Sequence, residues 1–158
     1  MDPLWDRYRR RSRGWIYDSH ARVHMKIEVG PHFKTPTATS HIINCAEDSL
    51  GSKWFKSIYP DRYACLNAVD SPDRDILTWY PEFESTMNKF LSDPACTLVY
   101  VHCECGINRS AFLVLTYMCR KFGYPFETLV KSMSSQRPCA FTNKSFRTQV
   151  ESYIKKHQ

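Results

Sequence analysis

Apolar residues fall into short runs and helical stripes that alternate along the chain. Three short runs, at 41–46, 63–69 and 97–102, are rich in β-branched and aromatic side chains and have the length of interior strands. An earlier segment, 23–29, has Val, Met, Ile and Val on alternate residues, which predicts one half-buried strand. We therefore expect at least four strands in the first two thirds of the chain.

Helical patterns separate and follow these runs. Between the second and third runs, apolar residues at helical spacing predict a helix that begins near Tyr80, because Pro81 fits only a first turn, and ends at Asp93. Residues 110–122 are apolar on nearly all sides, which predicts a buried central helix capped by Gly123. Residues 125–135 and 144–157 predict two more helices. The order predicts an α/β fold with a central, mainly parallel sheet of about four to five strands flanked by helices.

The length of 158 residues suits one domain, which we place at 21–158. Residues 1–20 form a separate basic and aromatic segment that contains the run RYRRRSR and two tryptophans. A short helix ahead of the domain is the structure that we expect for this segment, and it could mediate a homodimer. A solvated charge run is the simpler interpretation of its arginines.

The formal net charge of +6 and the isoelectric point near 9.0 favour anionic partners such as phosphoproteins, nucleic acid or acidic membranes. No apolar stretch reaches the roughly 18 residues of a membrane span, and the N-terminus lacks the apolar region of a signal peptide. The seven cysteines are odd in number and lie mostly in apolar segments, which favours reduced thiols. We therefore expect an intracellular, cytoplasmic protein, with the nucleus left open.

The segment HCECGINRSA, from His102 to Ala111, carries the candidate chemistry. It joins the end of a predicted strand to the start of the buried helix, a geometry that directs backbone N–H groups and the positive end of the helix dipole at one point. Such a field favours an oxyanion and the thiolate of Cys103. The guanidinium of Arg109 can hold two phosphoryl oxygens at once, and Ser110 can donate a hydrogen bond to the sulfur.

Two other interpretations of the paired cysteines are weaker. A zinc site of His102, Cys103 and Cys105 would need further ligands at suitable spacing, and the other cysteines lie within predicted strands or helices. A redox disulfide between Cys103 and Cys105 would close a very short, strained ring. Cys45, at the end of a neighbouring strand, could instead form a disulfide with Cys103, although a small buried thiol is the simpler role for it.

The pattern H-C-x-x-G-x-x-R-S resembles the signature loop of the cysteine-dependent protein phosphatases, in particular the small dual-specificity phosphatases, and poxviral members have a similar G-x-N-R-S loop. The resemblance extends from about residue 23 to 155 through HIINCAED, NAVDSPDRDILTWY and RPCAFTNKSFRTQV. It implies the phosphatase fold, Cys103 as nucleophile and no metal or cofactor. It also implies a phosphate-binding loop made of Glu104, Cys105, Gly106, Ile107, Asn108 and Arg109.

The resemblance also suggests the acid and the supporting residues. Asp70 follows a predicted strand at the family's spacing and is preferred over Asp73 as the general acid, while Asp75 is better interpreted as a helix N-cap. We expect His102 to orient the loop through hydrogen bonds. Asn108 and Asn143 either brace the loop or only satisfy turns. Glu104 is less typical of the loop, and its charge should weaken the binding of acidic peptides.

The resulting hypothesis is a protein phosphatase that hydrolyses phosphotyrosine and phosphoserine/threonine through a cysteinyl-phosphate intermediate, with phosphoproteins as partners. An RNA 5′-triphosphatase or a phosphoinositide phosphatase could use a related loop. Nucleic acid is therefore kept as a less favoured alternative partner. A phosphoprotein-binding pseudophosphatase is a third hypothesis. A viral source would place the protein in the virion or the host cytoplasm.

Overall fold

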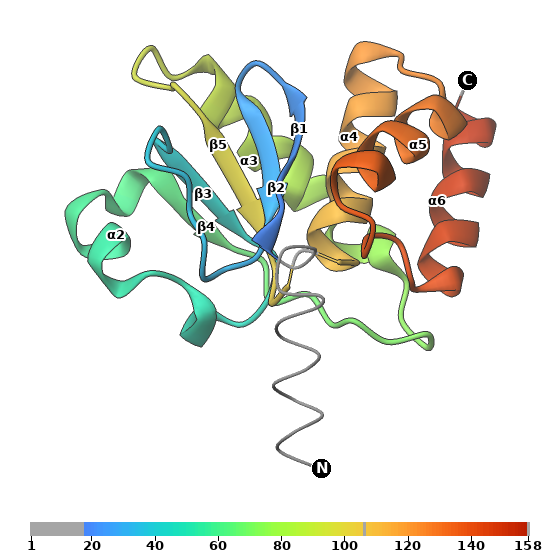
Figure 1. Cartoon of the computed structure of the whole chain (residues 1–158), viewed down its shortest axis with the longest axis horizontal. Helices are drawn as coiled ribbons and strands as arrows, with labels where there is room; N and C mark the ends of the chain where they lie inside the picture. The colour runs from blue at the N-terminus through green and yellow to red at the C-terminus, as the bar shows by residue number, and fades with distance from the viewer. Residues whose placement is uncertain (1–17, 106, 158) are drawn as a thin grey trace.

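The computed structural model describes residues 18–105 and 107–157. Most of the predicted N-terminal segment, 1–20, and the glycine of the loop, Gly106, lie outside the described residues. The described chain places a sheet beside a group of helices (Figure 1).

Five strands form one sheet in the order β1-β2-β5-β3-β4. The strands are β1 (Ala21–His24), β2 (Ile27–Gly30), β3 (His41–Asn44), β4 (Tyr63–Cys65) and β5 (Val99–His102). Only the edge pair β1 and β2 is antiparallel, and the other neighbours are parallel. The central strands β2, β3 and β5 are buried along their whole length, as expected for parallel strands covered by other elements. The predicted fold class is confirmed.

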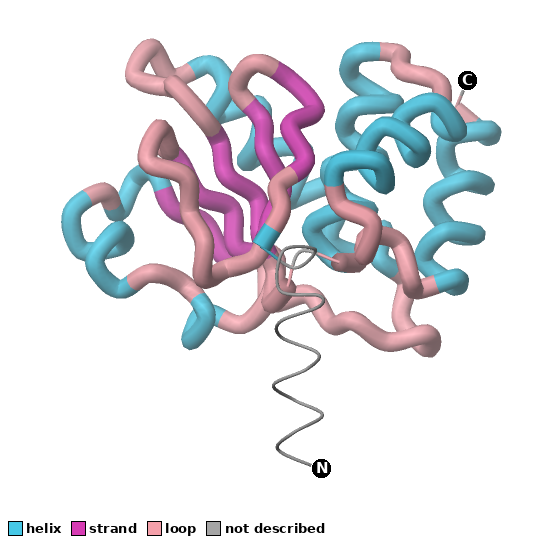
Figure 2. Tube along the Cα trace, in the orientation of Figure 1, coloured by secondary structure: helices cyan, strands magenta, loops and turns pink. Residues whose placement is uncertain are grey.

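The helices lie mainly to one side of this sheet and pack on one another (Figures 1 and 2). They are α2 (Lys53–Ile58), α3 (Tyr80–Ser92), α4 (Arg109–Phe122), α5 (Phe126–Gln136) and α6 (Lys144–Lys156), with short 3-10 turns at η1 (Asp48–Leu50), η2 (Pro60–Arg62) and η3 (Ile76–Trp79). Helix α4 is buried from its first residue to Cys119, and it contacts β2, β5 and the three other long helices. It is the central helix that the sequence predicts.

Two predicted strands differ from the structure. The segment 23–29 is a hairpin rather than one strand, because the chain turns at Met25, whose side chain is 79% exposed at the tip. The strand predicted at 63–69 ends at Cys65, since Asn67 adopts a left-handed backbone with φ of 55°. Helix α2 was not predicted. Gly123 does end α4 in the left-handed conformation, and Asp75 caps η3 as expected.

No helix in the described part of the chain combines the length and apolar character that a membrane crossing requires.

Candidate active site

The loop from Cys103 to Asn108 joins the end of β5 to the start of α4, as the sequence predicts. It borders a cavity of about 130 Å³. The described residues that line this cavity are Asp70, Cys103, Glu104, Cys105, Ile107, Asn108, Arg109 and Thr142. The fold therefore gathers most of the predicted site, although Asp70 and Thr142 come from distant parts of the sequence. Asp73 is not among these residues.

Cys103 and Ser110 lie next to each other beneath the cavity. Their Sγ and Oγ atoms are 3.3 Å apart, and the Ser110 side chain is fully buried. Ser110 lies in the first turn of α4, so the helix fixes its hydroxyl beside the sulfur. The hydroxyl can donate a hydrogen bond to Sγ, which stabilises negative charge on the sulfur.

Arg109 is held on one side by two hydrogen bonds. Its Nη1 donates to Oε1 of Glu47 and to the carbonyl oxygen of Ala68, both at 3.1 Å. Its buried Nε has no hydrogen-bond partner among the described residues. Burial lowers the pKa of Arg109, but the charges of Cys103 and Glu47 raise it more, so the pKa lies above its ordinary value. The charged edge that carries Nε is thus available for the oxygens of an anion.

Asp70 is fixed by two amide side chains. Nδ2 of Asn108 donates to Oδ2 of Asp70 at 3.0 Å, and Nδ2 of Asn143 donates to Oδ1 at 2.9 Å. Asn143 also caps α6, because its Oδ1 accepts from the N–H of Phe146 at 3.1 Å. The loop that carries Asp70 is therefore tied both to the phosphate-binding loop and to the N-terminus of α6.

His102 lies at the end of β5, with its Nδ1 2.9 Å from the carbonyl oxygen of Cys103. Burial lowers the pKa of His102 to about 4. The ring is neutral at neutral pH, and Nδ1 must carry its proton because a carbonyl oxygen only accepts. This hydrogen bond holds the backbone at the start of the loop.

Further contacts hold the loop from outside. The backbone N–H of His32 donates to the carbonyl oxygen of Glu104 at 3.2 Å. Buried Arg137 donates to the carbonyl oxygen of Cys105. The Glu104 side chain is 64% exposed, and its Oε2 lies 4.0 Å from Nη2 of Arg109. The roles of Glu47 and Arg137 were not predicted from the sequence. Each residue reaches the loop only through the folding of the chain, because its partner lies far away in the sequence.

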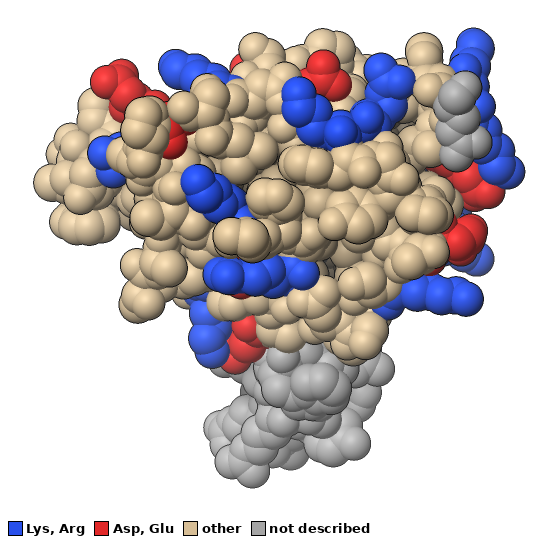
Figure 3. All heavy atoms as spheres, turned by 90° about the horizontal axis from the view of Figure 1, so that it is seen from above, with Lys and Arg blue, Asp and Glu red and all other residues tan. Residues whose placement is uncertain are grey.

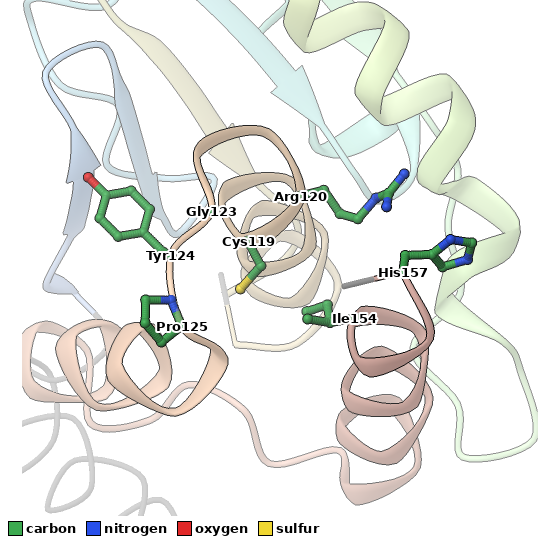
Figure 4. Close-up of a pocket in the computed structure, with 7 residues that line it drawn as sticks. All are labelled: Cys119, Arg120, Gly123, Tyr124, Pro125, Ile154 and His157. Carbon is green, nitrogen blue, oxygen red and sulfur yellow. The ribbon is translucent and has the colours of Figure 1, made fainter.

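A second hollow, of about 390 Å³, lies at the C-terminal end of α4 and also contains a cysteine. Figure 4 shows Cys119 pointing into it between Pro125 and Ile154. Burial raises the pKa of Cys119 to about 11, so this thiol stays protonated at neutral pH and is a poor nucleophile. The hollow has no carboxylate among its lining residues. We therefore place the candidate active site at Cys103.

In the described part of the chain, no group of three or more His, Cys, Asp or Glu side chains is arranged to hold a metal ion.

Comparison with protein families gives a match between residues 24–156 and the catalytic domain of dual specificity phosphatases. The chain belongs to this family. A probable dual specificity protein phosphatase of Dictyostelium discoideum is 34% identical over 101 residues, which are 64% of this chain and 24% of that protein. Protein phosphatase Slingshot homolog 3 of Mus musculus is 29% identical over 116 residues, 72% of this chain and 17% of that protein. The chain thus spans a quarter or less of the length of these relatives.

Solved structures show the same fold. Human DUSP28 matches with a TM-score of 0.73 at 19% identity, over 89% of this chain and 95% of that chain. The human tyrosine phosphatase-like serine/threonine/tyrosine-interacting protein matches with a TM-score of 0.68 at 22% identity, over 87% of this chain and 97% of that chain. The sheet and helices of this dual specificity phosphatase domain are therefore those of known phosphatase-like structures.

Proposed function

We propose that this domain hydrolyses phosphotyrosine and phosphoserine/threonine in proteins, with Cys103 as nucleophile, Arg109 as phosphate ligand, Asp70 as general acid and base, and Ser110 as the hydroxyl that assists the sulfur. The observation that carries the proposal is that one small cavity holds a buried cysteine, a fixed aspartate and an arginine whose Nε has no partner in the described part of the chain. Membership of the dual specificity phosphatase family supports it.

The first half-reaction transfers the phosphoryl group to the enzyme. The Cys103 thiolate attacks phosphorus in line, an S–P bond forms, and the bond from phosphorus to the leaving oxygen breaks. Arg109 and the backbone N–H groups of the loop bind the non-bridging oxygens as their charge rises. Asp70 gives its proton to the leaving oxygen, so that a neutral hydroxyl departs.

The second half-reaction releases phosphate. Asp70, now a carboxylate, takes a proton from a water molecule that attacks the cysteinyl phosphate. The S–P bond breaks, and the thiolate that forms is stabilised by the Ser110 hydroxyl, whose Oγ lies 3.3 Å from Sγ. Asp70 regains its proton, and inorganic phosphate leaves.

A binding module without turnover is the second candidate, because one similar structure is described as a tyrosine phosphatase-like interacting protein. The arrangement around Cys103 favours turnover. A phosphoprotein binder needs the anion site that Arg109 provides, but it needs neither a nucleophile beside a hydroxyl nor an aspartate held by two amides.

The test is the turnover of four substrates by the full chain: a phosphotyrosine peptide, a phosphothreonine peptide, triphosphorylated RNA and a phosphoinositide. We expect release of phosphate from both peptides and none from the matched variant Cys103→Ser. Preference for RNA or lipid would replace the proposed substrate class. Tight binding of both peptides without turnover would show that the domain is a binding module.

We further propose that residues 1–20 precede a catalytic domain at 21–158 and mediate a homodimer. Light scattering should give twice the monomer mass for the full chain and the monomer mass for a chain that begins near Arg22. Equal association states would exclude this role for the segment.

A further inference from the structure

A groove of about 560 Å³ lies between the β1–β2 turn and the C-terminal ends of α3 and α4. Leu91 and Phe122 supply its apolar surface, while Tyr117, which also borders the groove, is fully buried. The ring of Phe122 is 43% exposed, and His24 stacks on it with ring centroids 4.9 Å apart. The neighbouring Met25 side chain is 79% exposed at the turn. Exposed apolar groups that gather at one place mark an interaction surface more often than single ones do.

The charged residues that line the groove are all basic. Lys26 and Lys121 both line it, as does His24, and none of the lining residues is acidic. Neither lysine forms an ion pair with a carboxylate in the part of the chain that the structure describes. The Tyr117 hydroxyl donates to Oδ1 of Asn88 at 2.6 Å, so this hydroxyl is already engaged. The two ammonium groups are the cationic groups that the groove offers to a ligand. Figure 3 shows the molecule from above, with Lys and Arg side chains spread across this face and Asp and Glu side chains among them.

We propose that this groove binds an acidic segment of a partner protein, with an apolar side chain against Leu91 and Phe122 and carboxylates at Lys26 and Lys121. Electrostatic complementarity selects the acidic partner, and the apolar surface sets the position of the segment. A ligand that is anionic along its whole length, such as inorganic polyphosphate, would leave the apolar part of the groove uncovered. Flexible Met25 can adapt to the side chain that binds.

The groove lies far enough from Cys103 for both sites to be occupied together. Arg109 is the first residue of α4 and Phe122 is the last of its 14 residues, so a helix length of about 20 Å separates the cavity from the groove. A substrate that reaches both sites needs a spacer of at least about six extended residues. Under the proposed phosphatase function, on which this part rests, the groove would retain phosphoproteins that carry an acidic segment at such a distance.

Binding is measured with the full chain and a fluorescein-labelled peptide of glutamates with two leucines, by anisotropy. We expect the Lys26→Glu/Lys121→Glu variant to bind at least about tenfold more weakly, because two attractions become repulsions. The matched control, Lys131→Glu/Lys156→Glu, has the same net charge but reverses exposed lysines of α5 and α6, and it should bind as the unchanged chain does. Serines in place of the peptide leucines should also weaken binding.

Equal weakening by both double variants would reduce the interaction to general charge attraction and overturn the proposal, as would equal binding of the leucine and serine peptides. Tighter binding of single-stranded RNA at the same lysines would assign the groove to nucleic acid instead. Turnover of p-nitrophenyl phosphate should be unchanged in both double variants, because none of the four lysines lines the catalytic cavity. If the unchanged chain and both double variants all lack phosphatase activity, the proposed function is overturned, but the peptide-binding result stands.

Kinetics provide the second measurement. A phosphotyrosine peptide joined to the acidic segment by a flexible spacer of about fifteen residues should have a lower KM than the same peptide with a spacer of about three. The Lys26→Glu/Lys121→Glu variant should abolish this difference. The same KM for both spacers in the unchanged chain would contradict docking during catalysis.

Discussion

Glu47 accepts a hydrogen bond from Nη1 of Arg109 at 3.1 Å, across a separation of 62 residues. Glu47 follows β3, and Arg109 starts the helix that follows β5, so the contact joins the ends of two neighbouring parallel strands. It occupies one end of the guanidinium, and the buried Nε has no hydrogen-bond partner within residues 18–105 and 107–157. Glu47 is therefore a positioning residue for Arg109, the proposed phosphate ligand.

Replacement of Glu47 tests this relationship. We expect Glu47→Ala to lower kcat/KM for a phosphotyrosine peptide by roughly threefold to tenfold, because a charge-assisted but largely exposed contact is lost and the Ala68 carbonyl still holds Nη1. Glu47→Gln keeps an acceptor and should lose less. An increase in kcat/KM would mean instead that Glu47 competes with the substrate for Arg109.

The hydrogen bond from Asn143 to Asp70 predicts an effect that depends on the leaving group. Asn143→Ser removes the amide donor but keeps a residue that caps α6 well. We expect kcat to fall severalfold for a phosphothreonine peptide, whose alkoxide needs a proton, and to stay nearly constant for p-nitrophenyl phosphate, whose phenolate leaves without one. Asp70→Asn removes the proposed acid itself, so its effect on kcat for the two substrates is the reference for this comparison. An equal loss for both substrates would indicate general damage to the loop.

Ser110 should act mainly on the second half-reaction. In Ser110→Ala the sulfur loses its hydroxyl neighbour, so the thiolate becomes a poorer leaving group and hydrolysis of the cysteinyl phosphate slows by about tenfold. Rapid-quench kinetics should then show a burst of the first product followed by a slow steady state. A slower burst with an unchanged steady state would place Ser110 in the first step instead.

The buried, neutral His102 predicts a loss of stability in acid. Burial lowers its pKa from 6.5 to about 4 in the folded chain, so the unfolded chain binds more protons between these values. Folding stability should fall as the pH drops from about 6.5 toward about 4, by up to about 3 kcal/mol from this residue. The free energy of unfolding in urea should depend less on pH in His102→Gln, whose amide can still donate to the Cys103 carbonyl.

The exposed residue His157 gives the mutational control for this experiment, and His157→Gln is measured beside His102→Gln. The same slope in all three proteins would show that His102 does not contribute to the acid sensitivity.

Local patterns in the sequence predicted the fold class and the contiguous loop from His102 to Ser110, because a strand end, a turn and a helix start are encoded within a few neighbouring residues. The prediction of a single strand over 23–29 was wrong, because the chain turns between β1 and β2 at Met25, an apolar residue that lies exposed at the turn. The contact of Asn143 with Asp70 spans 73 residues. The mutual placement of such residues depends on the packing of α6 and the sheet, which local patterns do not specify.

Direct detection of phosphate on Cys103 is the measurement that tests the central claim most directly. The full chain is mixed with a phosphotyrosine peptide, quenched in acid and digested, and the fragments are analysed by mass spectrometry, with Cys103→Ser as the matched control. We expect one phosphate on the fragment that contains Cys103, and neither the modification nor turnover in the control. Turnover that survives Cys103→Ser, or phosphate on another residue during turnover, would contradict the mechanism.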